Sequence, residues 1–303
     1  MCGIVGLYLK DDALRPELGR RLTPMLIEMT DRGPDSAGFA VYRNGAPEGW
    51  TKLTLYHSAS TYDWAGLQDG LAGALDTTCQ GVRRASHFVL MTAAPADAAR
   101  QWIGDHHVDV RIMSVGESIE IYKEKGLPMV VAARFELETL SGSHAIGHTH
   151  MATESAVTTE HSHPFSTGRD LCLVHNGSLS NHNRLRAWLR RRGIEFQTDN
   201  DSEVAAGYLT YRLGQGASLK EALEAALKDL DGFFTFAIGT RDGFAVLRDP
   251  IACKHAVLAE TGQWVAMATE YRAIAKLPGS EEAHIWEPAP GRIYSWERSA
   301  ERH

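Results

Sequence analysis

Cysteine is scarce in this sequence, and no two cysteines stand close together. The chain of 303 residues contains four, Cys2, Cys79, Cys172 and Cys253. An iron–sulfur cluster and a structural zinc knuckle need closely spaced cysteines such as CxxC pairs, and a disulfide scaffold needs a regular framework of cysteines. The wide spacing therefore argues against all three. It favours a reducing compartment, the cytoplasm, where thiols stay free.

Long apolar runs and an excess of positive charge are also missing. No apolar stretch approaches the ~20 residues needed to cross a bilayer. The run Ile4–Leu9 is too short for a secretory signal and follows no basic region. The net charge of −7 offers no field that would attract nucleic acid or an anionic membrane. We expect a soluble, cytoplasmic protein without nucleic-acid or membrane partners.

The most informative feature that is present is the opening Met1-Cys2-Gly3-Ile4-Val5-Gly6. Removal of methionine would leave Cys2 with a free α-amine. The thiol would then be a nucleophile, and the α-amine, with an ordinary pKa of ~7.7–8.0, would be the base that accepts its proton. Such a nucleophile must be held rigidly. The apolar run behind it predicts a central strand over residues 2–9.

The apolar pattern predicts strands at the start, middle and end of the chain, with helices between them. Helical spacing is found over 15–30, 180–192, 202–213 and 219–230. Strand-like runs are found at 36–43, 51–57, 145–150, 171–175, 234–239, 244–248, 255–259, 264–269 and 292–296. The dipeptide Asn44-Gly45 predicts a hairpin between the strands 36–43 and 51–57.

Residues 58–143 follow a different pattern. They alternate between predicted strands at 87–92 and 108–115 and helical spacing at 64–75, 95–104 and 127–140. This alternation predicts a small α/β insertion. The insertion carries no chemical motif.

Polar residues gather in four segments at the ends of predicted elements: Arg32–Gly38, Gly147–Thr153, His175–Gly177 with Asn181, and Thr198–Glu203. Each has a structural explanation when taken alone. The first would be a turn and the third an Asn-Gly turn. In the fourth, Asp201 or Ser202 would cap a helix.

In this order behind Cys2, the segments resemble those of the class II glutamine amidotransferases. These N-terminal-nucleophile hydrolases cut the side-chain amide of glutamine and pass on the ammonia. The resemblance runs to about Lys276 and leaves 58–143 unmatched. It implies an α+β fold, a four-layer αββα sandwich. One amidotransferase domain would span residues 2–303, with residues 58–143 as a small α/β insertion within it.

The resemblance also implies three catalytic residues. Cys2 would be the nucleophile that forms a thioester. The side chain of Asn176 and the backbone N–H of Gly177 would form the oxyanion hole. Such donors are needed because attack on the carboxamide places negative charge on its oxygen.

Four further residues are implied to act on the substrate. Asp201 resembles the carboxylate that binds the α-ammonium of glutamine, Thr153 a contact to its α-carboxylate, and Arg32 an arginine that orients the nucleophile region. The chain departs from the family at His150, where an arginine usually clamps the α-carboxylate through two hydrogen bonds. Histidine offers at most one donor there and is only partly charged near pH 7. We therefore expect glutaminase activity with a poorer affinity for glutamine.

The histidines suggest a competing metal site, because His144, His148, His150, His161, His163 and His175 crowd one part of the chain. His148 and His150 would share a strand face, and zinc binds such ligands. No HExxH spacing or set of carboxylates accompanies them. We expect no metal and no cofactor on this chain.

Class II glutaminase domains normally supply ammonia to a synthase domain. About 27 residues follow Lys276, too few for such a domain. We therefore expect the acceptor site on another polypeptide, or a stand-alone glutaminase. The segments Met151–Val157 and His163–Gly168 look closest to the small amidotransferase subunits of glutamate synthase-like complexes, including N-methylglutamate synthase. That likeness implies a hetero-oligomer whose flavin and iron–sulfur groups lie on the partner subunits.

Two other interpretations remain open. A different N-terminal-nucleophile hydrolase, acting on another amide, would keep Asp201 and the oxyanion pair while His150 marks a changed substrate pocket. A non-catalytic regulatory module would retain Met1, and Cys2 would be merely the first residue of a strand. Intact mass and glutamate release distinguish the three.

Overall fold

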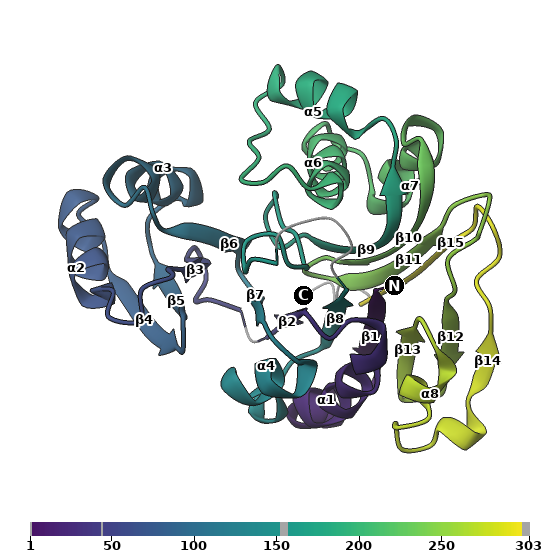
Figure 1. Cartoon of the computed structure of the whole chain (residues 1–303). Helices are drawn as coiled ribbons and strands as arrows, with labels where there is room; N and C mark the ends of the chain where they lie inside the picture. The colour runs from purple at the N-terminus through teal and green to yellow at the C-terminus, as the bar shows by residue number, and fades with distance from the viewer. Residues whose placement is uncertain (1, 44, 152–156, 299–303) are drawn as a thin grey trace.

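The computed structural model describes residues 2–43, 45–151 and 157–298, which form two stacked sheets between layers of helices (Figure 1). The first sheet has the strand order β14 (His284–Trp286), β12 (Val257–Glu260), β13 (Trp264–Ala268), β1 (Gly3–Leu9), β8 (His144–His150), β2 (Ser36–Tyr42) and β7 (Ile119–Lys125). The second has the order β15 (Ile293–Glu297), β11 (Gly243–Arg248), β10 (Gly232–Gly239) and β9 (Cys172–Leu179). Both sheets are built from antiparallel pairs.

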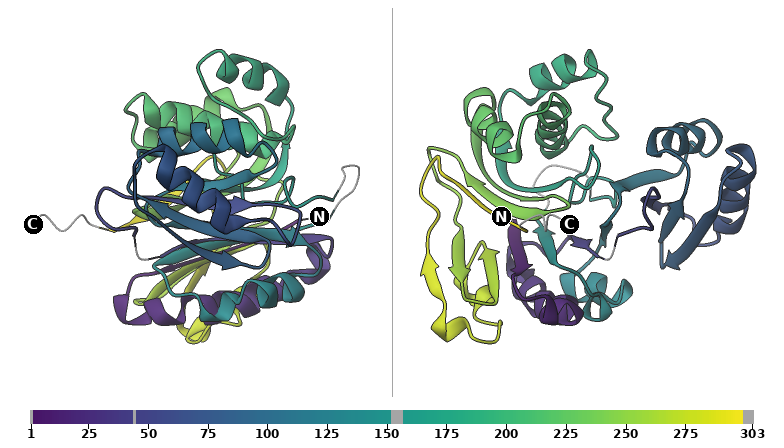
Figure 2. Two further views of the ribbon diagram at one scale, coloured as in Figure 1. Left: turned by 90° about the vertical axis from the view of Figure 1, so that its left-hand side faces the viewer. Right: turned by 180° about the vertical axis from the view of Figure 1, so that it is seen from behind.

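Helices cover the outer face of each sheet, as the two turned views also show (Figure 2). The seven-stranded sheet is covered by α1 (Leu18–Glu28), α4 (Pro128–Arg134) and α8 (Tyr271–Ile274). The four-stranded sheet is covered by α5 (His182–Arg190), α6 (Asp201–Gly214) and α7 (Leu219–Asp229). Short 3₁₀ turns occupy Asp12–Glu17, Thr30–Arg32, Leu137–Thr139 and Ser280–Glu282.

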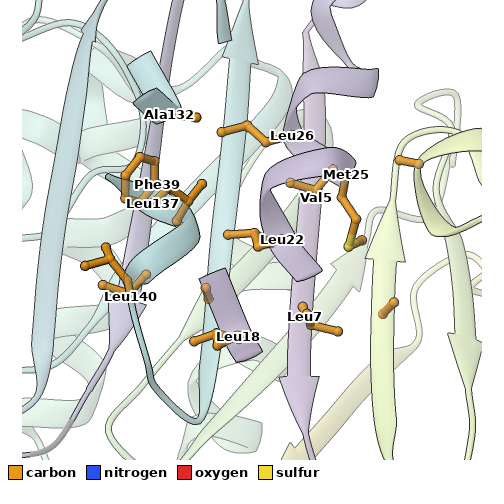
Figure 3. Close-up of a cluster of buried hydrophobic side chains, with 14 of the residues drawn as sticks. Val5, Leu7, Leu18, Leu22, Met25, Leu26, Phe39, Ala132, Leu137 and Leu140 are labelled. Atoms are coloured by element: carbon orange, nitrogen blue, oxygen red, sulfur yellow. The ribbon is translucent and has the colours of Figure 1, made fainter. Parts of the chain in front are cut away.

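Strand β1 contributes to two cores because its side chains alternate between the faces of the sheet. Val5 and Leu7 point toward α1 and pack with Leu22 and Leu26 (Figure 3). Ile4 faces the other sheet and joins the core between the sheets. This gives four layers, and the predicted αββα sandwich is confirmed.

A third sheet projects from one side of the body (Figures 1 and 2). Its strand order is β4 (Cys79–Arg84), β5 (His87–Thr92), β3 (Thr51–Tyr56) and β6 (Arg111–Gly116), and it packs with α2 (Trp64–Ala74) and α3 (Ala96–His106). Strand β3 lies between β5 and β6 in this sheet, so the two strands that α3 connects are not neighbours. This sheet and its two helices form a small α/β unit over residues 51–116, and the insertion at 58–143 stays a prediction. β7 and α4, which also fall within 58–143, pack with the main body.

The predicted hairpin between 36–43 and 51–57 is wrong. Strand β2 pairs with β8 and β7, whereas β3 pairs with β5 and β6 in the third sheet. Both edges of β2 are occupied, so no edge is left for β3. Asn44 itself lies outside the described residues. In the part of the chain that the structure describes, no helix is both long and apolar enough to span a membrane.

Candidate active site

Cys2 stands directly before β1, the middle strand of the seven-stranded sheet. Backbone groups at the start of β1 are bonded or paired along both edges of the strand. The N–H of Ile4 donates to Thr269 Oγ1 at 2.8 Å, and Gly3 is paired with Thr149 of β8. The prediction of a central strand directly behind Cys2 is confirmed.

Two predicted site residues touch Cys2. The sulfur of Cys2 lies 3.3 Å from Nδ1 of His150, the last residue of β8. The side-chain amide of Asn176, on β9, donates to the carbonyl oxygen of Cys2 at 3.1 Å. Asn176 is buried. Cys2, the predicted nucleophile, therefore lies between the two sheets, where the ends of β1 and β8 meet β9.

The surroundings of the Cys2 thiol keep it protonated. Burial raises its pKa above the ordinary value of 9.0, while the backbone N–H of Met151 and the charges of Lys254 and Arg32 lower it without cancelling the rise. Since the thiolate is the reactive form, the thiol needs a base to take its proton.

Gly177 presents its N–H to the open edge of β9. β9 is the edge strand of its sheet, so alternate N–H groups point away from β10. The N–H groups of Leu173 and Leu179 do so, since they donate to Phe165 O at 2.9 Å and Asp201 Oδ2 at 2.8 Å. Gly177 is an even number of positions from Leu173 and Leu179, so its N–H also points away from β10. Its φ is +152°, and a Cβ atom there would lie 2.0 Å from the oxygen of Phe233, so only glycine fits.

Asp201 is the first residue of α6. Its carboxylate lies at the same edge of β9, where it accepts from the N–H of Leu179. The predicted capping by Asp201 or Ser202 is wrong, because Asn200 is the N-cap and accepts from the N–H of Ser202 at 2.8 Å. Burial by itself would raise the pKa of Asp201. The imidazole of His175, 3.7 Å away, and the N–H of Leu179 outweigh burial and lower that pKa to about 2. The carboxylate is therefore charged at neutral pH.

Arg32 lies in the turn before β2, close to the end of β8. Its Nε atom is 3.1 Å from a carboxylate oxygen of Glu270. The next residue, Gly33, allows the close approach, since a Cβ atom there would lie 2.4 Å from the backbone nitrogen of His150. Arg32 contributes positive charge at Cys2. Thr153, the remaining predicted residue, lies outside the described residues.

Three of the six crowded histidines, His148, His163 and His175, form a buried hydrogen-bonded group, whereas His144 bonds to Thr240 and His161 pairs with Asp199. His148 and His163 stack with their ring centres 4.0 Å apart, and Nε2 of His148 lies 3.2 Å from the oxygen of His175. Ser202 Oγ joins His163 at 2.8 Å and His175 at 2.9 Å. Burial lowers the pKa of His148 and His163 well below 6.5, so both rings are neutral. Among the described residues, no three side chains of metal-ligating type gather to hold a metal ion.

Comparison with known proteins places these features in a family. Residues 148–276 match a family model described as a glutamine amidotransferase domain. Over 297 residues the chain is 56% identical to the glutamine amidotransferase-like protein GlxB of Rhizobium meliloti (strain 1021), covering 98% of each protein. The chain belongs to the class II glutamine amidotransferases. This amidotransferase is also 32% identical to a putative glutamine amidotransferase of Methanothermobacter thermautotrophicus, over 97% of this chain and 99% of that protein.

A solved structure supports the fold of the amidotransferase. The allosteric regulatory enzyme of purine biosynthesis superimposes with a TM-score of 0.64 at 21% sequence identity. The match covers 98% of this chain but 47% of that enzyme, so the amidotransferase spans about half its length. At this identity the likeness concerns the fold alone.

The structure adds residues to the amidotransferase site that the sequence analysis missed. Thr269 anchors the start of β1, and Ser202 joins two buried histidines. Lys254 places a positive charge near the thiol, and Glu270 pairs with Arg32. Ser202 and Thr269 lie at the ends of predicted elements, which is a weak signal. Nothing in the sequence pointed to Lys254 or Glu270, because only the tertiary fold brings Lys254 near Cys2 and Glu270 to Arg32.

Proposed function

We propose that this amidotransferase hydrolyses glutamine to glutamate and ammonia through a thioester on Cys2 and delivers the ammonia to a synthase on a partner chain. One observation carries the proposal. Cys2 and the Asn176 amide meet at the junction of the two sheets, since that amide donates to the Cys2 carbonyl oxygen at 3.1 Å. A nucleophile and a buried amide donor at one point are what attack on a carboxamide requires.

The reaction starts with loss of the thiol proton. In the proposed mature chain Met1 has been removed, and the α-amine of Cys2 is a base. Sulfur then forms a bond to the carboxamide carbon, and the C=O π electrons move to oxygen. The second N–H of the Asn176 amide and the N–H of Gly177 stabilise that oxygen.

The tetrahedral intermediate collapses when the C–N bond breaks. The departing nitrogen takes up a proton and leaves as ammonia, and the acyl group stays on sulfur as a thioester. Water attacks the thioester carbon and the C–S bond breaks. Glutamate is released, and the proton lost by water returns to the sulfur of Cys2.

The α-amino acid end of glutamine is bound by charge. The carboxylate of Asp201 receives the α-ammonium, and it is anchored by Leu179, two residues beyond Gly177 on β9. Two residues of a strand span roughly 7 Å. That span suits an amino acid with three carbons between its ammonium-bearing carbon and its amide nitrogen. In this proposal Arg32, His150 and Thr153 act on the α-carboxylate side.

Delivery to a partner chain is supported by the length of the relatives. The two relatives reported above are matched over 98% and 99% of their own lengths, so neither has room for a synthase domain outside the matched region. We propose a glutamate synthase-like or N-methylglutamate synthase-like partner. Flavin and iron–sulfur groups would lie on that partner, and the amidotransferase itself would carry no cofactor.

One observation favours a second candidate function. His150 replaces the arginine usual in the family and lies against the thiol instead of in an ion pair with a carboxylate. A hydrolase that acts on an amide without an α-carboxylate would have no use for that arginine. Amide hydrolysis by Cys2 would be common to both candidates, and the substrate would differ.

The test combines mass, activity and association. The protein is purified from its native host under mild conditions, its intact mass is measured, and co-purifying chains are identified. Glutamate release from glutamine is assayed for the isolated chain and for the complex. We expect loss of Met1, synthase-like partners, and faster glutamate release in the complex.

Three outcomes would contradict parts of the proposal. A retained Met1 in active protein would contradict the role of the α-amine. Hydrolysis of simple primary amides without hydrolysis of glutamine, in both preparations, would favour the second candidate. Full glutaminase activity with no associated chain would contradict delivery to a partner.

A further inference from the structure

A buried lysine that the proposed function does not use lies on β7, the strand that ends the seven-stranded sheet. Lys123 shares a face of β7 with Ile121, which belongs to the core between the sheets. Its ammonium donates to three backbone carbonyl oxygens, those of Glu160 at 3.1 Å, Ser162 at 2.7 Å and Pro164 at 3.2 Å. An ammonium has three N–H donors. All three are therefore used by one short segment, residues 157–165.

The 157–165 segment passes around the edge of β7 and joins the two sheets. Thr159 donates its hydroxyl hydrogen to Glu124, whose carboxylate lies on the outer face of the sheet and pairs with Arg134 of α4. Successive residues of a strand point to opposite faces, so Glu124 and Lys123 hold the segment from both faces. At the far end, the N–H and C=O of Phe165 both bond to Leu173 of β9.

Gly38 on β2 lets the segment lie close to the sheet beside Lys123. A Cβ atom at Gly38 would lie 2.1 Å from the oxygen of His163 and 2.5 Å from Cβ of Lys123. Nζ of Lys123 also lies 4.6 Å from the ring centre of Phe165, a favourable cation–π distance. The ammonium therefore lies among groups of the segment on several sides.

The segment carries His163 into the histidine group near Asp201. Two of the carbonyl groups that Lys123 binds, those of Ser162 and Pro164, directly flank this histidine. The backbone is thus held on both sides of His163, and Nε2 of its ring lies 2.8 Å from Oγ of Ser202. A displaced segment would take the imidazole away from that hydroxyl.

Ser202 connects His163 to Asp201. Its hydroxyl oxygen lies 2.9 Å from Nδ1 of His175 and 3.3 Å from Oδ1 of Asp201. His175 is itself 3.7 Å from that carboxylate and lowers its pKa. The orientation of the Asp201 carboxylate therefore depends on a series of contacts that begins at Lys123.

We infer that Lys123 is a positioning residue for the glutamine site, because its ammonium fixes the 157–165 segment. Through His163 and Ser202, that segment keeps the carboxylate of Asp201 directed at the α-ammonium of glutamine. The inference rests on the proposed function. Lys123 acts on the binding of glutamine and takes no part in the attack by sulfur. A small displacement of a binding group is enough to weaken binding.

The surroundings of Lys123 make its charge sensitive to pH. Burial lowers the pKa of Lys123 to about 8, although the charges of Glu203 and Glu160 oppose that shift. The ammonium is therefore mostly present at pH 7 and loses one of its three donors as the pH rises toward 9. The charged and titratable groups that face Lys123 are Glu160 and His163 of the segment, Glu203 of α6, His87 of β5 and Arg111 of β6.

The first test compares wild type, Lys123→Met and the control Lys125→Met. Lys125 lies two residues further along β7, on the same face, and is exposed. KM and kcat for glutamate release are measured at pH 7 in the isolated chain and in the complex. We expect Lys123→Met to raise KM about tenfold with a much smaller change in kcat. Lys125→Met should match wild type. An unchanged KM in Lys123→Met would overturn the positioning role.

The pH dependence of KM separates this role from a merely structural one. The ratio of KM in Lys123→Met to KM in wild type cancels the titration of glutamine and of the Cys2 α-amine, because both chains share them. We expect the ratio to decrease between pH 7 and pH 9, since wild type then loses the charge as well. A constant ratio would overturn the role of the ammonium.

A third measurement does not depend on a variant folding. The N–H groups of His161, Ser162 and Phe165 are hydrogen-bonded, so hydrogen–deuterium exchange reports whether the segment stays in place. In wild type we expect the protection of this segment, corrected for the intrinsic exchange rate, to fall severalfold between pH 7 and pH 9. The protection of β10 should stay constant. Equal protection of the segment at both pH values would overturn the anchor.

Glutamate release by wild type distinguishes a failure of this inference from a failure of the proposed function. Wild type that releases glutamate while Lys123→Met keeps its KM would leave the function standing and refute the positioning role. If neither the isolated chain nor the complex releases glutamate, the proposed function fails. Segment protection that falls with pH and in Lys123→Met would then still support the anchor.

Discussion

The side-chain amide of Asn176 donates to the carbonyl oxygen of Cys2 across 3.1 Å, and this hydrogen bond joins two different sheets. Cys2 precedes the middle strand of the seven-stranded sheet, while Asn176 lies on the edge strand of the four-stranded sheet. The distance between nucleophile and amide donor is therefore set by the apolar core between the sheets, which includes Ile4 and Val174. Close packing of that core keeps this distance fixed.

Replacement of Cys2 by alanine should abolish glutamate release without unfolding the protein. The variant removes the sulfur that forms the proposed thioester, and it removes little buried volume. The matched control is Cys79→Ala on β4, whose sulfur contacts Thr92 in the third sheet. Activity and thermal melting of both variants check this. Full activity in Cys2→Ala would rule out the nucleophile.

Asn176→Ala should lower kcat about 10²–10³-fold, the usual effect of losing one oxyanion donor. It also removes the bond to Cys2 and should cost about 1 kcal/mol of stability. The comparison is Asn181→Ala, whose amide donates to Asp229 O at 2.8 Å and accepts from the N–H of Asp231. That variant should lose similar stability but keep its kcat. Equal rate losses in both variants would mean that Asn176 acts only in folding.

Asp201→Asn should raise the KM for glutamine with a smaller effect on kcat, because the neutral amide no longer attracts the α-ammonium. The control is Asp199→Asn, two residues earlier. The Asp199 carboxylate is almost fully exposed and pairs with His161. Steady-state kinetics of glutamate release measures both. An unchanged KM in Asp201→Asn would exclude this carboxylate as the ammonium site.

The free energy of unfolding should depend on pH through Asp201. The pKa of Asp201 is about 2 in the folded protein and 3.8 ordinarily, so folding favours the ionised form. That contribution, about 2 kcal/mol, is fully present above pH 3.8 and is lost as pH falls toward 2. Urea unfolding should therefore show Asp201→Asn less stable than wild type at pH 7. If the difference in unfolding free energy between wild type and Asp201→Asn does not decrease between pH 4 and pH 2, the lowered pKa of Asp201 does not stabilise the fold.

His150→Arg should separate binding from chemistry. A guanidinium can clamp the α-carboxylate through two hydrogen bonds, so the KM for glutamine should fall about tenfold. Because the α-amine of Cys2 is the base in the proposed mechanism, kcat should change much less than KM. Initial rates over a range of glutamine concentrations give KM and kcat separately. An unchanged KM would mean that position 150 does not act on the carboxylate.

Much of the fold follows from local pattern. A continuous apolar run located β1, which is buried on both faces of the sheet. Helical spacing located α1 and α7, because each of these helices has one face that must be buried. The short strands β4 and β14 were missed, since their side chains are mostly exposed and show no apolar alternation. The hairpin at Asn44-Gly45 failed because a turn signal does not say which strand will occupy the neighbouring edge.

The sequence by itself determined the order of the chemical groups: a cysteine at the start, an Asn-Gly pair in the middle and Asp201 at the start of a helix. The tertiary structure decided which of these groups touch. It alone placed the His150 imidazole against the sulfur, brought Arg32 and Lys254 close enough to act on the thiol, and freed Asp201 from capping by giving that role to Asn200. The physical reason is that strand pairing and sheet packing join residues more than a hundred positions apart, and neither is encoded in local spacing.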